Sequence, residues 1–283
     1  MFTRRSFLQC TSLALSGRSI ASAISLQNGT DRQQKENSES LTERYPAYGP
    51  DRIERLVTVS HFSLDKVKEV VDPHPQLVKA AWDWGFGDWE TPLGAACHMG
   101  RRDIAEYLLS KGATPSLFSA VLFGDLTFVK QTVERQPGIE RVAGPHSISL
   151  LAHARMGGKN AEGVFAYLHA LGDADMASPT RLADEERKII CGSYQVGHDP
   201  SHVVVVSDDV SAYANSPMYT YAPQLNWKHN RTMARPLFHL GGMAFYPAGA
   251  PSIQIRFERG AQAVTMTVRD GAEVLTASRS FIA

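Results

Sequence analysis

The chain has 283 residues, of which 43% are hydrophobic and 20% are charged, as in ordinary globular proteins. Its 29 basic and 29 acidic side chains balance to a formal net charge of zero, which excludes a general attraction to nucleic acid or to anionic membrane surfaces. The length exceeds what a single compact core usually holds, so we expect two folded domains.

The N-terminus is typical of a segment that directs export. Arg4 and Arg5 precede a modest apolar stretch over residues 8–15, and small residues then offer a cleavage site. This arrangement resembles a bacterial twin-arginine signal, which implies an export signal peptide over residues 1–23 and a periplasmic or secreted protein. An ordinary amphipathic tail is the alternative. Residues 24–50 are rich in polar side chains and predict a flexible leader.

Two short helices are predicted after Thr91. The Thr91 hydroxyl can cap a helix N-terminus, and Pro92 suits the first helical position, where a missing N–H costs nothing. Gly100 supplies a left-handed stop, and a second helix with an apolar stripe over residues 104–109 runs on to Gly112. Neither helix is long enough to be stable alone, so each needs neighbours that cover its apolar face.

The same pattern recurs along the chain at intervals near a period of about 33 residues. The leucines that share one column of this pattern are Leu56, Leu93, Leu117 and Leu150. Residues 51–178 therefore resemble the ankyrin-repeat family, although Gly94 stands where that family usually has histidine. The resemblance implies about four stacked helix pairs with a concave side that binds another protein. A generic array of helical hairpins is the alternative.

Residues 186–283 carry the period-two pattern of β-strands. Apolar and polar residues alternate over residues 253–258, as a strand with one buried face requires. Gly260 and Gly271 fall between such runs and indicate hairpin turns. The predicted fold class is therefore a multidomain α plus all-β protein, in which an ankyrin-like solenoid precedes a small antiparallel β-meander or barrel.

Two short motifs in this region, Gly192-Ser193-Tyr194 and Phe245-Tyr246-Pro247, resemble those of small β-domains appended to exported serine hydrolases. The resemblance implies an accessory domain and brings no functional residues with it. The hydrolase domain itself has no counterpart in this sequence.

The sequence contains no established catalytic constellation. A Gly-x-Ser-x-Gly elbow, a His-Glu-x-x-His zinc helix and a Cys-x-x-Cys pair are all missing, so we expect neither an enzyme nor a cofactor. The segment from His198 to His202 holds potential metal ligands, but a polar loop before a strand explains it equally well, and no metal site is expected. Cys97 is predicted to be a small buried side chain, and the sequence does not decide whether it forms a disulfide with Cys191.

An aromatic cluster precedes the best-matching repeat, where the ankyrin family has a β-turn finger. Exposed aromatic residues there would anchor a partner, whereas packing against the neighbouring repeats is the alternative. Basic residues and a histidine on the adjoining helices could complete a polar rim. The candidate partner-binding residues are Trp82, Trp84, Phe86, Trp89, His98, Arg101 and Arg155.

The expected function is non-catalytic binding of another protein by the concave face of the helical part. One alternative is a small-ligand carrier that uses the interior of the β-domain as its pocket. A second is an accessory or degenerate hydrolase that depends on His198, His202 or His239. No membrane span is expected, because no segment has the ~20 apolar residues that it needs.

Overall fold

The computed structural model describes residues 46–283 apart from 177–179, 199–200, 214–215, 230–232 and 281–283. The chain separates into two units, Met1–Pro50 and Asp51–Ala283, and the second carries the fold described below. The predicted signal peptide and most of the predicted leader lie outside the described residues.

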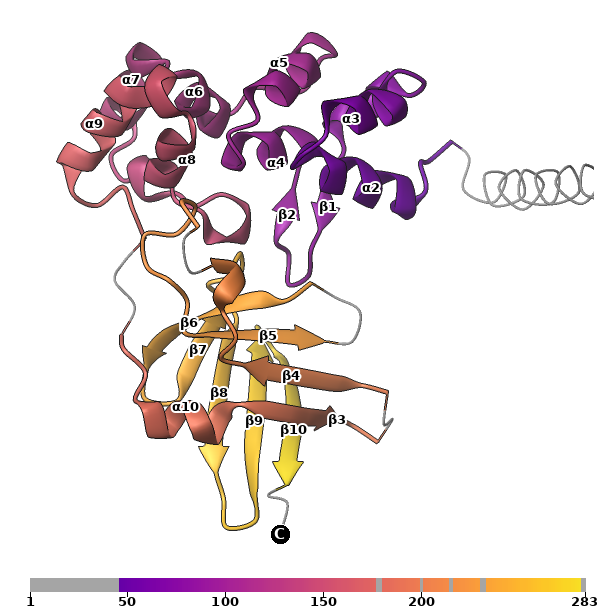
Figure 1. The fold of residues 1–283 in the computed structure, drawn as a ribbon, viewed down its shortest axis with the longest axis vertical. Coiled ribbons are helices and arrows are strands. Elements are labelled where there is room, and N and C mark those ends of the chain that lie inside the picture. Colours follow the sequence, from indigo (N-terminus) through magenta and orange to yellow (C-terminus); the bar gives the residue numbers. More distant parts are fainter. Residues whose placement is uncertain (1–45, 177–179, 199–200, 214–215, 230–232, 281–283) are drawn as a thin grey trace, which may run out of the picture. The chain divides into compact units, whose positions relative to one another are not determined.

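Paired short helices form the first part of the described chain (Figure 1). The pairs are α2 (Pro50–Ser60) with α3 (Leu64–Val71), α4 (Pro92–His98) with α5 (Arg102–Ser110), α6 (Leu117–Phe123) with α7 (Leu126–Arg135), and α8 (Leu150–Met156) with α9 (Glu162–Leu171). Helices α4, α6 and α8 pack against one another. Leu56, Leu93 and Leu150 are buried, and Leu117 is partly buried against the same helical core, so the short helices and three of the four core positions are confirmed. None of the described helices has the length and apolar character that crossing a membrane requires.

The predicted helix boundaries around Thr91 are confirmed. The Thr91 hydroxyl accepts a hydrogen bond of 3.0 Å from the Gly94 backbone N–H, and Pro92 opens α4. Gly100 and Gly112 adopt φ values of 66° and 93°, the left-handed conformation that glycine adopts at little cost. These stops keep each helix short and turn the chain back on itself.

A small hairpin, here called the finger, precedes α4. It consists of β1 (Trp82–Asp83) and β2 (Trp89–Glu90), which pair antiparallel with Trp82 opposite Glu90. One Asp83 carboxylate oxygen accepts hydrogen bonds from the backbone N–H groups of Gly85 and Gly87, which fixes the tip. Figure 1 shows the finger directed towards the strands that follow.

Antiparallel strands form the last part of the described chain, after α10 (Asp184–Ile190). They are β3 (Gly192–Val196), β4 (Val203–Ser207), β5 (Leu225–His229), β6 (Arg235–Gly241), β7 (Ala244–Pro247), β8 (Gln254–Arg259), β9 (Ala263–Asp270) and β10 (Glu273–Ser280). Neighbours in sequence pair with one another, and β10 pairs with β3, so the sheet closes into a barrel. The predicted antiparallel β-domain is confirmed in this closed form, which removes exposed sheet edges.

Large side chains fill the core of this barrel. Tyr194, Phe245 and Phe257 are each at most 1% exposed and pack in one cluster with aliphatic residues from nearly every strand. A small-ligand carrier that uses the barrel interior needs a cavity there, and this packed core gives that alternative no support.

The finger and the helices contact the barrel directly. The Phe86 ring at the finger tip stacks on Trp227 of β5, with ring centroids 5.3 Å apart. Arg235, the first residue of β6, donates hydrogen bonds to the Trp84 carbonyl oxygen at 2.7 Å and to the Asp88 carboxylate at 3.2 Å. The finger therefore forms part of the contact between the helices and the barrel, and Ile148 and Ala152 also pack against Phe238 and Ala248.

Candidate metal centre

Three histidines and one glutamate converge at the base of the finger. One ligand atom from each of His61, Glu90, His98 and His146 lies within 4.8 Å of the corresponding atoms of the other three. His61 follows α2, Glu90 ends β2, His98 ends α4, and His146 lies in a short turn before α8. Segments far apart in the sequence thus bring together imidazole and carboxylate groups, the side chains that bind zinc and related ions.

Each histidine of the cluster lies close to an oxygen of Glu90. The Nε2 atoms of His61 and His146 lie 3.4 and 3.5 Å from Oε2 of Glu90, and Nε2 of His98 lies 3.6 Å from Oε1. With metal–ligand bonds of 2.0–2.1 Å, neighbouring ligand atoms in a tetrahedral site lie about 3.3 Å apart. Each Nε2 therefore lies about as far from a Glu90 oxygen as two ligands of one ion lie from each other.

Several polar atoms of the cluster are buried without a hydrogen-bond partner. Glu90 is fully buried and His98 is 1% exposed. Among the described residues, Oε1 of Glu90 and both ring nitrogens of His98 are buried and make no hydrogen bond. A buried carboxylate and imidazole left in this state cost free energy, and an ion bound between them would satisfy Oε1 and Nε2 together.

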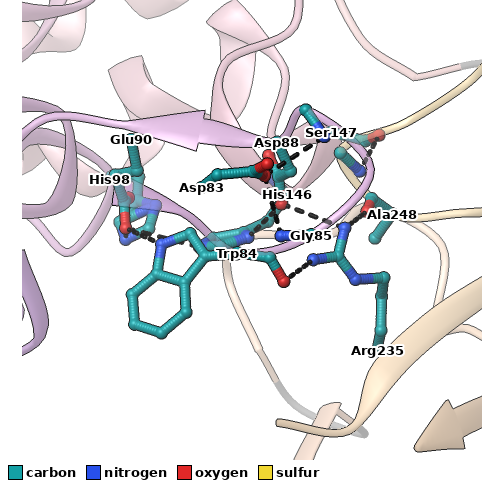
Figure 2. A network of polar contacts seen from close by, with 12 residues as sticks. Asp83, Trp84, Gly85, Asp88, Glu90, His98, His146, Ser147, Arg235 and Ala248 are labelled. Atoms are coloured by element: carbon teal, nitrogen blue, oxygen red, sulfur yellow. Dashed lines mark hydrogen bonds and ion pairs between the residues drawn. The ribbon is translucent and has the colours of Figure 1, made fainter. Parts of the chain in front are cut away.

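The other ring nitrogens of two histidines are fixed by acceptors. Nδ1 of His61 lies 3.0 and 3.1 Å from the carbonyl oxygens of Val57 and Thr58. Nδ1 of His146 lies 2.9 Å from the Asp88 carboxylate (Figure 2). Because carbonyl and carboxylate oxygens only accept, each Nδ1 must carry a hydrogen, so Nε2 is the ring nitrogen that can offer a lone pair to a metal. Such outer partners are the usual support of metal-binding histidines.

A strained turn places His146 in the cluster. Among the described residues, the non-glycine residues with positive φ are Phe86, His146 and Ser147, each near 60°. This conformation costs on the order of 1 kcal/mol per residue and needs support from its surroundings. The barrel part supplies that support, because the Tyr219 hydroxyl donates to the His146 carbonyl oxygen and the Gly249 N–H donates to the Ser147 hydroxyl.

The cluster shifts the pKa values of its histidines in opposite directions. Burial, together with the nearby histidines, holds the pKa of His98 well below its usual value, so its ring stays neutral. Burial also acts to lower the pKa of His146, but hydrogen bonds to Asp88 and Glu90 and the charges of both carboxylates outweigh it and raise that pKa to about 9. A metal-free site therefore carries a proton on His146 near neutral pH, and an incoming ion would displace it.

A small pocket opens beside the three histidines. Its volume is about 180 Å³, and His61, His98 and His146 form one wall. The rest of the lining is mostly apolar, with Arg235 as the one charged residue among the described lining residues. An ion held by the cluster would therefore face a pocket large enough for a small organic molecule.

Some of the predicted partner-binding residues contribute to the histidine cluster, and the others lie elsewhere in the structure. His98 belongs to the cluster, and Trp84 donates its indole N–H to Oε2 of Glu90 at 2.8 Å (Figure 2). Phe86 packs on the barrel, which is the alternative considered for the aromatic cluster. Trp82 is half-buried, whereas Trp89 is 61% exposed.

The two predicted basic residues are engaged within the chain. Arg101 pairs with Asp103 and also donates to the Phe62 carbonyl oxygen. Arg155 donates to the carbonyl oxygen of Pro217, at 2.9 Å, in the segment between β4 and β5. Arg155 thus helps to hold the helices against the barrel part in this structure.

The remaining residues singled out from the sequence are three histidines, His198, His202 and His239, and two cysteines, Cys97 and Cys191. His239 is buried, and its two ring nitrogens lie 2.9 and 2.5 Å from backbone carbonyl oxygens, which gives the hydrolase alternative no free base there. His198 and His202 lie on either side of residues 199–200, which are outside the described residues. Cys97 and Cys191 are both free thiols, so the disulfide that the sequence left open is not formed.

No metal site was expected from the sequence, and His61, Glu90 and His146 were not among the candidate residues. One signal was present: His61 and His98 follow the aligned leucines Leu56 and Leu93 at the same spacing, so stacked repeats would place them side by side. Nothing comparable marked His146, because its position depends on a turn that the barrel part supports.

No protein-family model matches this chain, and no curated protein matches it either. The assignment of the site therefore rests on its geometry and chemistry.

Proposed function

We propose that this protein binds a divalent transition-metal ion through His61, Glu90, His98 and His146 and presents that ion to the adjoining pocket. The observation that carries the proposal is the convergence of three Nε2 atoms on one buried carboxylate, with ligand atoms within 4.8 Å of one another. Imidazole nitrogen with a single carboxylate suits zinc, cobalt, nickel, copper or iron, whereas magnesium and calcium prefer oxygen ligands.

The role of the ion would be to bind and polarise a small molecule in the pocket. Four protein ligands complete a tetrahedron, and an ion such as zinc can expand to five ligands when another donor approaches. Three of the four proposed ligands, His61, His98 and His146, line the pocket. There the ion would act as a Lewis acid on an oxygen atom brought by the small molecule.

Metal binding by the purified full chain tests this proposal. After removal of metal with a chelator, the chain is titrated with Co²⁺, and the visible absorption and stoichiometry are measured. We expect one ion per chain and a spectrum typical of nitrogen and oxygen ligands. His98→Gln should weaken binding by at least about 100-fold, because it removes a direct ligand, whereas loss of an outer partner costs 10–100-fold.

The matched control is His153→Gln, since His153 is also fully buried beside the cluster but is not one of the converging ligands. It should leave Co²⁺ affinity within a few-fold of the wild type. Circular dichroism establishes that both variants fold. The proposal fails if the wild type binds no transition metal, because Glu90 is then balanced by protonated His146 alone, or if both variants weaken binding equally.

Binding of another protein is a second candidate function, favoured by one exposed residue. Trp89 at the base of the finger is 61% exposed, and large exposed aromatic side chains often anchor partners. Under this proposal the paired helices are ankyrin-type repeats that present the finger to the partner. Capture of a specific partner by the wild type and its loss with Trp89→Ala would support this proposal, and equal capture by both would contradict it.

The location of the protein follows from its N-terminal sequence and is proposed to be periplasmic or secreted. The support is the arginine pair Arg4 and Arg5 before an apolar stretch. Fractionation of cells that express the wild type or the double variant Arg4→Lys, Arg5→Lys tests it. Retention of the variant inside the cell is the expected outcome, and identical distribution would contradict it.

A further inference from the structure

The pocket beside the histidine cluster has a size and polarity that restrict what it can hold. Its volume is about 180 Å³. A cavity of ~150 Å³ lined by apolar side chains is enough for benzene, so this pocket admits about one ring with a small substituent. Away from the histidines its walls are largely apolar, and the aliphatic and thioether residues on them include Met99, Ile148, Met218, Met233, Pro236 and Ala248.

The polar groups on the other walls already have partners. The Tyr213 hydroxyl donates to the Ala234 carbonyl oxygen at 3.1 Å, and the Tyr219 hydroxyl donates to the His146 carbonyl oxygen at 2.9 Å. Arg235 donates to Asp88 and to two backbone carbonyl oxygens. A ligand with several hydroxyl or phosphate groups would therefore lose hydrogen bonds to water that these walls do not replace.

The net charge of the site further restricts which small apolar molecules can bind in the pocket. Apart from the three histidines, Arg235 is the charged residue among the described residues of the lining, and the Asp88 carboxylate neutralises it at 3.2 Å. A divalent ion bound by neutral imidazoles and the single Glu90 carboxylate leaves one net positive charge. Because that charge faces an apolar pocket, one negative charge on the ligand restores neutrality, whereas a cation or a dianion leaves a net charge that is costly to bury.

We infer that the pocket binds a small apolar monoanion, of the class of aryl or short-chain carboxylates, with its charged oxygen on the metal ion and its apolar part against the methionines. This inference rests on the metal site proposed above. It assigns the ligand of that site by charge, size and polarity, and these are the properties that the test varies.

The experiment uses the full chain loaded with Co²⁺, in a buffer free of carboxylates. Benzoate, benzamide and phthalate are titrated separately while the visible spectrum of the ion is recorded. Benzoate should change the spectrum in a saturable way. Benzamide has nearly the same shape without the charge and should bind at least about 10-fold more weakly, and phthalate, a larger dianion, should also bind more weakly.

A pocket variant shows whether the ligand lies where the structure places it. Met218 is half-buried and lines the pocket, but it is not among the converging ligands. In Met218→Trp the larger side chain should fill the space and weaken benzoate binding at least about 10-fold, while the Co²⁺ stoichiometry and the spectrum without benzoate stay unchanged. The unchanged spectrum also reports that the variant is folded.

The outcomes separate the two proposals. If Co²⁺ binds but benzoate leaves the spectrum unchanged, or benzamide binds as tightly, the ligand assignment is wrong and the metal site stands. Full benzoate binding by Met218→Trp with Co²⁺ bound overturns the assignment to this pocket. If the wild type binds no Co²⁺, the metal site fails and the ligand assignment falls with it.

Discussion

At the scale of single residues, Asp88 joins three parts of the molecule. Its carboxylate is 2% exposed and accepts hydrogen bonds from the backbone N–H and Nδ1 of His146 and from Arg235. Burial acts to raise the pKa of Asp88, but the hydrogen bonds and charges of His146 and Arg235 outweigh it and hold that pKa below its usual value. A Cβ on Gly249 would overlap this carboxylate, so the barrel part closes tightly on it.

Asp88→Asn is expected to weaken metal binding by about 10–100-fold without changing the stoichiometry, because the amide lacks the charge that orients His146 and increases its basicity. Co²⁺ titration measures the change. The control is Asp83→Asn in the same finger, since Asp83 accepts from the tip amides of Gly85 and Gly87 and is not one of the converging ligands. Equal affinity in both variants would show that Asp88 does not support a ligand.

His153 should make the stability of the metal-free protein depend on pH. Its Nδ1 lies 2.8 Å from the Ser149 carbonyl oxygen, its Nε2 is buried without a hydrogen-bond partner, and burial lowers its pKa to about 4. This pKa lies below the ~6.5 of histidine in the unfolded chain. As the pH falls, the unfolded state therefore binds more protons than the folded state does. His153 therefore makes its full contribution to the unfolding free energy above about pH 6.5 and loses it as the pH falls from about 6.5 to 4.

Between pH 7 and pH 5 the wild type should lose about 2 kcal/mol more unfolding free energy than His153→Gln. Urea unfolding of both proteins in the presence of a chelator measures this difference. An equal loss in the two proteins would mean that His153 does not carry this pH dependence.

At the scale of elements, the ends of the short helices depend on glycines whose surroundings differ. Gly124 ends α6 with φ of 77°, and a Cβ there would overlap the carbonyl oxygen of Asn160 in the turn before α9. Gly112 follows α5 with φ of 93°, and a Cβ there would meet nothing within 4 Å. The first glycine is therefore required by packing as well as by conformation, and the second by conformation alone.

This difference gives a matched pair of variants. Gly112→Ala should cost about 1 kcal/mol of unfolding free energy, the usual penalty for a left-handed alanine. Gly124→Ala should cost on the order of 2–4 kcal/mol, because backbone must also shift to relieve the overlap. Urea midpoints measure both, and equal losses would show that the contact with Asn160 is not tight.

At the scale of the whole second unit, an ion at the cluster would link α2, the finger, α4 and the turn before α8. An ion that binds the folded chain and not the unfolded chain stabilises the fold by mass action. Zn²⁺ at 100 times its dissociation constant should therefore raise the unfolding free energy by about 2.7 kcal/mol.

Thermal or urea unfolding with and without Zn²⁺ tests this prediction, and Mg²⁺ is the control because it prefers oxygen ligands in octahedral geometry. Glu90→Gln should remove the effect of Zn²⁺. Stabilisation of Glu90→Gln to the same extent as the wild type would place the bound zinc elsewhere on the chain.

Local chemistry in the sequence determined the helix cap at Thr91, the stops at Gly100 and Gly112, the alternating strands and the hairpin turn at Gly271. Each of these depends on residues only a few positions apart, so a short stretch contains the whole cause. The apolar pattern also determined that short helices must pair and that the last part of the chain is antiparallel β-structure.

Tertiary structure alone decided the candidate site. Asp88 and Arg235 lie 147 residues apart in sequence, and His146 reaches Glu90 only because a strained turn is supported by Tyr219 and the barrel. Packing also decided that Phe86 stacks on Trp227 rather than facing solvent. The physical reason is that hydrogen-bonding and ion-binding groups act over a few ångströms in space, and no local pattern records which distant segments the folded chain brings within that distance.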